Sequence, residues 1–157
     1  MKKTSNKGFS MVELIIVIAI MAILAAALAP ALIKYINKSR LSTDIQTGQT
    51  IATSIQSALA DETANNAAVS LGTTKVNDIL GNRTSDSFAS EFAQIMGANS
   101  VTGKSKKDVN GSSFTDQNFY VEMDPSSNKV NVWYGSTTGT NVNDWLVSPT
   151  PGAGMTK

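Results

Sequence analysis

The 157-residue chain contains no cysteine and no histidine. The first absence excludes disulfide bonds, thiolate nucleophiles and cysteine metal sites, and the second removes the commonest general base and metal ligand near neutral pH. We therefore expect no catalytic residues, no enzymatic activity and no cofactor. Any folded region must be held together by packing and hydrogen bonds alone.

Charged residues are also sparse, at 16% of the chain, with a formal net charge of +1. Three of the 13 basic side chains, Lys2, Lys3 and Lys7, lie within the first eight residues, and the remaining ten face 12 acidic ones. This balance gives no reason to expect nucleic-acid binding.

What the chain does contain is one long apolar run near its start. From Leu14 to Ile33 there are 20 residues without a charge. At about 1.5 Å per residue, a helix of this length crosses roughly 30 Å of hydrocarbon. Glu13 stands directly before the run, and a carboxylate at the centre of a bilayer costs about 2.5 to 3.5 kcal/mol. Glu13 therefore requires a partner.

Two alternative interpretations of this segment need no assembly. Ser10 and Glu13 have the S-x-x-E spacing of a capping box at a helix start, and this role is compatible with a functional one. The small-x-small tripeptide 27–29 has the form of a signal-peptidase site. Against the second interpretation, Pro30 would be the first mature residue, Glu13 would lie inside the apolar core, and that core would exceed the usual length of about 7–15 residues.

The N-terminus resembles that of type IV prepilins and pseudopilins. The matching residues are Lys7-Gly8 before a cleavage point, Phe9 after it, Glu13 four residues further on, and the apolar helix through Pro30. The resemblance covers about the first 35 residues. Many Gram-negative pilins close their C-terminal region with a disulfide, and this chain has no cysteine to do so.

The resemblance implies that a prepilin peptidase cuts between Gly8 and Phe9 and methylates the new amino group of Phe9. The subunit would wait in the cytoplasmic membrane, surrounded by lipid, with its basic leader inside. An assembly platform and its ATPase would then insert it into an extracellular filament of its own copies, used for adhesion, motility or colonisation. Glu13 would pair with the amino group of a neighbouring subunit. Two alternatives stay open: a pseudopilin of type II secretion or DNA uptake, and a monomeric membrane-anchored binding domain.

The spacing of apolar residues predicts that the helix continues beyond the membrane. One stripe recurs at steps of three and four: Leu41, Ile45, Gly48, Ala52, Ile55 and Leu59. Such a stripe is typical of an amphipathic helix, so we expect one helix from Phe9 to about Asp61. Pro30 should kink it, and Gly48 is a second weak point. The chain thus divides into a leader (1–8), an apolar helix (9–33), an amphipathic continuation (34–61) and a head (62–157).

The head sequence predicts short helices and a small antiparallel sheet. We expect one helix over 74–80 and a second that is capped by Ser85 or Asp86 and stopped by Gly97. The second helix has four apolar residues on one face: Phe88, Phe92, Ile95 and Met96. Residues 118–123 and 129–134 alternate apolar and polar side chains on either side of a turn, and this pattern predicts a β-hairpin. We also expect a third strand near 143–147 and a flexible tail over 149–157. The fold class is therefore α+β, a long helical spine packed against a small sheet.

Several motifs in the head are ambiguous. ANSVTGKS, at 98–105, falls one residue short of a phosphate loop and lacks the flanking strand and helix. Asp108, Asn110 and Asp116 offer oxygen ligands that calcium prefers, although a turn rich in Asp and Asn is the better interpretation. The S-x-x-K pattern at 126–129 lies in a hairpin turn. Trp133 is the best candidate for an exposed contact.

Overall fold

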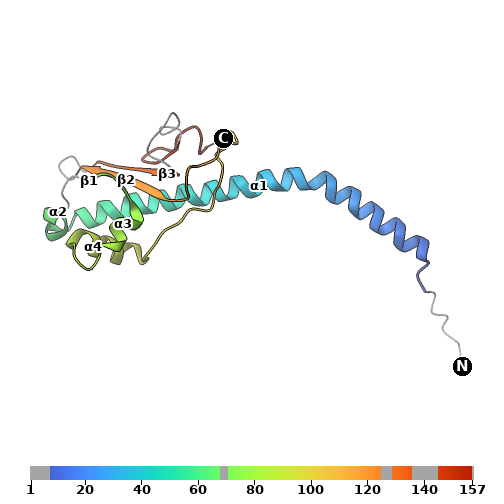
Figure 1. The fold of residues 1–157 in the computed structure, drawn as a ribbon, viewed down its shortest axis with the longest axis horizontal. Helices are drawn as coiled ribbons and strands as arrows, with labels where there is room; N and C mark the ends of the chain where they lie inside the picture. Colours follow the sequence, from blue (N-terminus) through green and yellow to red (C-terminus); the bar gives the residue numbers. More distant parts are fainter. Residues whose placement is uncertain (1–7, 68–70, 125–128, 136–144, 157) are drawn as a thin grey trace, which may run out of the picture. The chain divides into compact units, whose positions relative to one another are not determined.

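Helix α1 (Met11–Leu59) is the longest element of the computed structural model, which describes residues 8–67, 71–124, 129–135 and 145–156. Its 49 residues correspond to about 74 Å at 1.5 Å per residue. The chain divides into two units, 1–36 and 37–157, and α1 runs through both (Figure 1). The helix continues through Pro30, and the kink expected there remains a prediction.

In the first unit every described side chain is exposed. The second unit, in contrast, buries one face of α1 in a hydrophobic core that also includes the sheet and the smaller helices (Figure 1). The buried residues of this face are Leu41, Asp44, Gly48, Ile51, Ala52, Ser54, Ile55, Ala58 and Leu59. Five of the six stripe residues are among them, and Ile45 is partly buried against the core. The predicted amphipathic stripe is confirmed.

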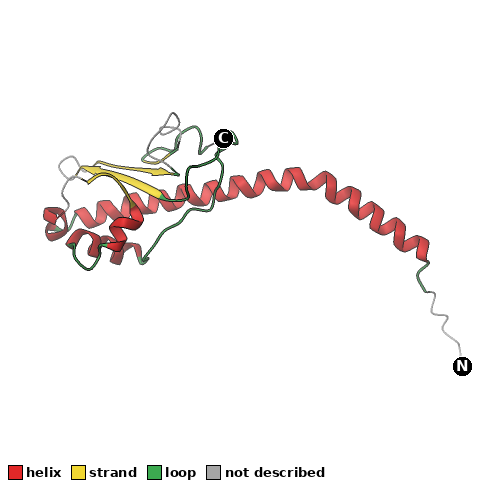
Figure 2. Ribbon diagram, viewed as in Figure 1, coloured by secondary structure: helices red, strands yellow, loops and turns green. Residues whose placement is uncertain are grey.

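Among the described residues, the sheet of the second unit has four antiparallel strands in the order β1-β2-β3-β4. Figure 2 shows strands of this sheet (yellow) beside the part of α1 that belongs to the same unit. The four strands are β1 (Leu71–Lys75), β2 (Phe119–Asp124), β3 (Lys129–Tyr134) and β4 (Leu146–Ser148). Strands β2 and β3 pair without interruption, and Val121 opposite Val132 contributes to the core. The predicted hairpin is confirmed, as is the α+β class of the fold.

Three short helices complete the unit: α2 (Glu62–Ala67), α3 (Val76–Gly81) and α4 (Ser87–Met96). Helix α4 begins as predicted, because the Asp86 carboxylate accepts a hydrogen bond from the N–H of Ala89, 2.9 Å away. It ends at Gly97, whose φ of 62° is a left-handed conformation that a residue without Cβ adopts at little cost.

Some expectations for the head were incomplete or wrong. Strand β1 and helix α2 were not predicted. Ile95 is exposed, because the buried face of α4 is centred between Phe88, Ala89 and Phe92 and leaves Ile95 at its edge. Strand β4 begins at Leu146, and the first part of the expected third strand, 143–144, lies outside the described residues.

The C-terminal tail is packed rather than flexible. The Met155 side chain is 2% exposed. Backbone hydrogen bonds join Gly152 N to Leu146 O and Val109 N to Gly154 O, at 2.8 and 2.9 Å. The tail is ordered because it covers the core beside the 105–109 loop.

The surroundings of Gly48, expected to be a weak point of the helix, and of Trp133, expected to be exposed, also differ from the predictions. A Cβ on Gly48 would lie 2.8 Å from Cβ of Val147, so the missing side chain lets β4 approach the helix closely. Trp133 lies on the face of the sheet opposite the core but is half-buried, and its Nε1 is buried with no hydrogen-bond partner among the described residues. It is therefore not the exposed contact that we expected.

Candidate assembly segment

The N-terminal end of α1 is closed by a capping box. The N–H of Ser10 donates to Oε2 of Glu13 at 2.8 Å, and the N–H of Val12 donates to Oγ of Ser10 at 3.3 Å. These bonds occupy two N–H groups that have no partner inside the helix. The predicted capping box is confirmed, and it fixes the Glu13 side chain beside the backbone of Ser10.

Gly8 and Phe9 precede the helix and are exposed. The Phe9 side chain is 85% exposed, and a Cβ added to Gly8 would meet nothing within 4 Å. The bond between the two residues therefore lies in an accessible segment that precedes the helix. The structure thus places Gly8, Phe9 and Glu13 together at the start of α1, while cleavage and methylation there remain predictions.

The helix that follows exposes an unusual amount of apolar surface. Large apolar side chains such as Leu28 and Ile33 are 66% and 68% exposed, and no large side chain between Phe9 and Ile36 is buried. Soluble monomers rarely expose apolar surface of this extent. In the described part of the chain, α1 is the one helix long and apolar enough to cross a membrane. Lipid or other protein must cover it.

Glu13 is the only ionisable side chain between Gly8 and Ile33. Among the described residues, its partner is the N–H of Ser10, which is neutral. The N-terminal dipole of the helix favours a negative charge at this position but does not neutralise it. A cation from outside the helix would do so.

The sequence matches a family model, the prokaryotic N-terminal methylation motif, over residues 3–29. This motif marks an N-terminus similar to that of type IV prepilins and pseudopilins. The motif implies processing by a prepilin peptidase and assembly into a filament, and with the apolar helix it fits anchoring in a membrane before assembly. Comparison with solved structures finds no significant match.

The ambiguous loops of the head have structural roles. The carboxylate of Asp108 accepts hydrogen bonds from the N–H groups of Asn110 and Ser112, at 2.9 and 2.8 Å, and from Nε1 of Trp145 at 3.3 Å. Asp116 accepts from Asn118 N at 3.0 Å. These carboxylates organise turns, and no cluster of three metal-binding side chains occurs in the described part of the chain. The first three residues of the S-x-x-K pattern at 126–129 lie outside it.

Helix α1 also contains a buried acid that the sequence did not lead us to expect. Asp44 is 1% exposed, and its two carboxylate oxygens accept the N–H groups of Lys104 and Ser105 at 2.8 Å each. The segment that resembled a phosphate loop is therefore bound to the helix. The hydroxyl of Tyr134 donates to Ser105 O at 2.6 Å from the other side. Burial, with the charge of Asp44, raises the pKa of Tyr134 above its ordinary value.

On the side of the sheet that faces away from the core, the side chains of Tyr120 and Asp116 form a hydrogen-bonded pair. The hydroxyl of Tyr120 donates to Oδ2 of Asp116 at 2.5 Å. Burial and this bond to a carboxylate raise the pKa of Tyr120 to about 12. Burial opposes the charged form of Asp116, but the hydrogen bonds from Tyr120 and Asn118 outweigh it and hold the pKa of Asp116 below its ordinary value.

Proposed function

We propose that the protein is a main structural subunit of a type IV pilus, cut between Gly8 and Phe9, methylated on Phe9 and polymerised through α1. The observation that carries the proposal is Glu13, the one acid in the part of α1 up to Ile36, where every apolar side chain is exposed. A membrane anchor needs the apolar surface but has no use for the acid.

Processing would create the missing cation. The α-amino group of Phe9 has an ordinary pKa near 8 and is cationic at neutral pH. Phe9 and Glu13 are about 6 Å apart along the helix axis, so one subunit's amino group reaches a neighbour's Glu13 after a small axial shift. Two unpaired charges inside an apolar bundle would cost several kcal/mol, and this penalty selects the register in which they meet.

The exposed apolar surface would supply the cohesion of the filament. Side chains between Phe9 and Ile36 are available for packing along the whole segment. Leaving lipid brings little hydrophobic gain, so helix association there depends on van der Waals packing and contacts between helices. The partners implied are other copies, the prepilin peptidase, and an assembly platform with its ATPase. The same N-terminus would serve a pseudopilin of type II secretion or DNA uptake, and filament length under electron microscopy separates the two.

Variants of the capping box test whether filament assembly depends on the charge of Glu13 or only on its role in starting the helix. Glu13→Gln keeps an oxygen that accepts the N–H of Ser10 but removes the charge, whereas Ser10→Ala removes the bond to Val12 and keeps the charge. We expect Glu13→Gln and Glu13→Ala to enter the membrane and to yield less than about a tenth of the wild-type filaments after shearing, given a penalty of several kcal/mol. Ser10→Ala should assemble normally.

The measurement is the amount of processed subunit in sheared filaments relative to that in membranes. Wild-type yield from Glu13→Gln together with loss in Ser10→Ala would reduce Glu13 to a capping residue and refute the proposed pairing. A wild-type chain found only in membranes, with none in the sheared fraction, would favour a monomeric membrane-anchored domain.

A further inference from the structure

The second unit has a basic patch at one end, formed by five exposed side chains: Lys38, Arg40, Lys104, Lys106 and Lys107. Three hydrogen bonds hold the 104–107 loop against α1, one of them the bond from Ser105 N to Asp44 described above. Nδ2 of Asn37 donates to Lys107 O at 3.5 Å, and the Asp44 carboxylate accepts the N–H of Lys104 at 2.8 Å. The three lysines of the loop therefore lie close to Lys38 and Arg40 of the helix.

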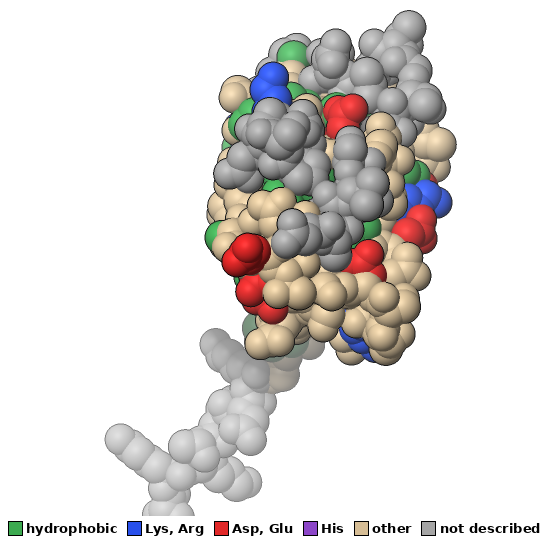
Figure 3. All heavy atoms as spheres, turned by 90° about the vertical axis from the view of Figure 1, so that its left-hand side faces the viewer, with side chains coloured by type: hydrophobic (Ala, Val, Ile, Leu, Met, Phe, Trp, Pro, Cys, Tyr) green, Lys and Arg blue, Asp and Glu red, His purple; other side chains and the backbone are tan. Residues whose placement is uncertain are grey.

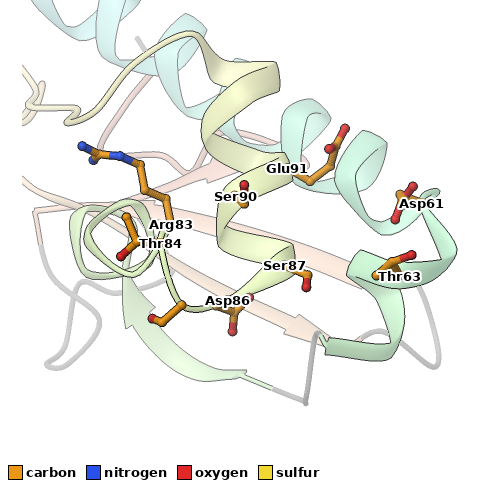
Figure 4. A pocket seen from close by; sticks show the side chains of 9 residues that line it. Asp61, Thr63, Arg83, Thr84, Asp86, Ser87, Ser90 and Glu91 are labelled. Atoms are coloured by element: carbon orange, nitrogen blue, oxygen red, sulfur yellow. The ribbon is translucent and has the colours of Figure 1, made fainter.

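An acidic patch lies where α1 ends. It consists of Asp61, Glu62, Asp86 and Glu91, from the end of α1, from α2 and from α4, and α2 packs against α4. Three of these carboxylates line an open hollow of about 410 Å³, together with Arg83 and several hydroxyl groups (Figure 4). The space-filling view of this end shows carboxylate side chains on its surface (Figure 3).

The two patches do not neutralise each other within one copy. Lys38 and Leu59 are about 30 Å apart along α1, several times the screening length of about 8 Å at physiological salt. The acidic residues nearest to the basic patch in sequence cannot pair with its lysines either. Asp44 and Asp108 are 1% and 3% exposed, and all their carboxylate oxygens already accept hydrogen bonds, from backbone N–H groups and, at Oδ2 of Asp108, from Nε1 of Trp145.

We propose that the acidic patch of one copy docks against the basic patch of the next copy along the filament. This inference rests on the proposed function and names the contact between heads. Unlike ends that meet head to tail form an open, repeating contact, whereas like ends repel, so the arrangement also sets the direction in which copies add. Each exposed ion pair contributes little, and the contact therefore supplements the packing of α1.

A charge swap tests the contact in the full-length chain. The basic-patch variant combines Lys106→Glu and Lys107→Glu, and the acidic-patch variant combines Asp61→Lys and Glu62→Lys. A third variant carries all four substitutions. We expect each patch variant to lower the yield of sheared filaments about fivefold, since a reversed pair repels where it attracted, and the combined variant to recover most of that yield.

The matched control reverses two acids outside both patches, Asp78→Lys and Glu122→Lys, which changes the net charge as the acidic-patch variant does. It should assemble as the wild type. A basic-patch variant that loses filaments and is not rescued by the swap would mean that the patch binds something else, such as anionic lipid headgroups, and would overturn the proposal.

Disulfide cross-linking tests the same contact without depending on filament yield, because the native chain has no cysteine. A chain carrying both Lys107→Cys and Glu62→Cys should form a ladder of covalent multimers on mild oxidation in cells, and either single variant only dimers. No species beyond the dimer from the double variant refutes the contact. A ladder from chains that retain their leader supports the contact and contradicts the pilus assignment, so the two failures are distinguishable.

Discussion

Replacing Asp44 should destabilise the head severely although the residue is remote from the assembly segment. Its carboxylate accepts two backbone N–H groups at 2.8 Å, those of Lys104 and Ser105, and Ser105 is fully buried. In Asp44→Ala both donors lose their partner. An unsatisfied buried donor costs about 1 to 3 kcal/mol.

The sum for two donors is about 2 to 6 kcal/mol, and partial opening of the loop to water brings the expected loss to about 2 to 4 kcal/mol. Domains of this size are stable by about 5 to 15 kcal/mol, so the loss is a large share of the total. Asp44→Asn keeps one acceptor oxygen and turns an NH₂ group toward the second donor. It should cost about half as much as Asp44→Ala.

The measurement is the free energy of unfolding of the full-length chain in detergent, followed by the fluorescence of Trp133 and Trp145. Thr50→Ala is the control, because Thr50 is exposed and its hydroxyl donates only within its own helix, to Gln46 O. It should change stability by less than about 0.5 kcal/mol. An Asp44→Ala variant as stable as this control would refute the reasoning.

Two further predictions concern Tyr134 and its surroundings. A Cβ on Gly103 would overlap the Tyr134 ring, so Gly103→Ala should lower the free energy of unfolding by about 1 to 3 kcal/mol, whereas Gly81→Ala, with open space around it, should be near neutral in the same titration. The folded state raises the pKa of Tyr134 and raises that of Tyr120 to about 12, from an ordinary value of 10.0. It therefore keeps protons that the unfolded chain loses. The contribution of the two tyrosines to stability should be constant below about pH 10 and fall as the pH rises from there toward 12. Tyr120→Phe should flatten this decline, and an unchanged slope in that variant would contradict the assignment.

The elements that periodicity predicted are those that bury one regular face. The stripe from Leu41 to Leu59 specified the packed face of α1, and the alternation in β2 and β3 specified the hairpin. The two ends of α4 were also predictable, because capping by Asp86 and termination at Gly97 depend only on neighbouring residues in the sequence.

The elements that the sequence analysis missed depend on distant partners. Strand β1 includes Gly72 and Thr73, both exposed, and it is a strand because it pairs with β2, which follows more than 40 residues later. Asp44 lies three residues after Leu41 and four before Gly48, so its place on the buried stripe could have been recognised. The backbone donors that satisfy it come from a loop 60 residues away.

The N-terminal site was the most predictable part of the molecule. Gly8, Phe9 and Glu13 belong to one short motif, and the capping bond between Ser10 and Glu13 follows from their spacing alone. The two charged patches were not predicted, because their members come from separate segments that only the fold brings together.

The central claim is tested most directly by the intact mass and N-terminal sequence of subunits in filaments sheared from cells that make the protein. The account predicts a chain that begins with methylated Phe9 and lacks residues 1–8. Filaments built from chains that still begin with Met1 would contradict it.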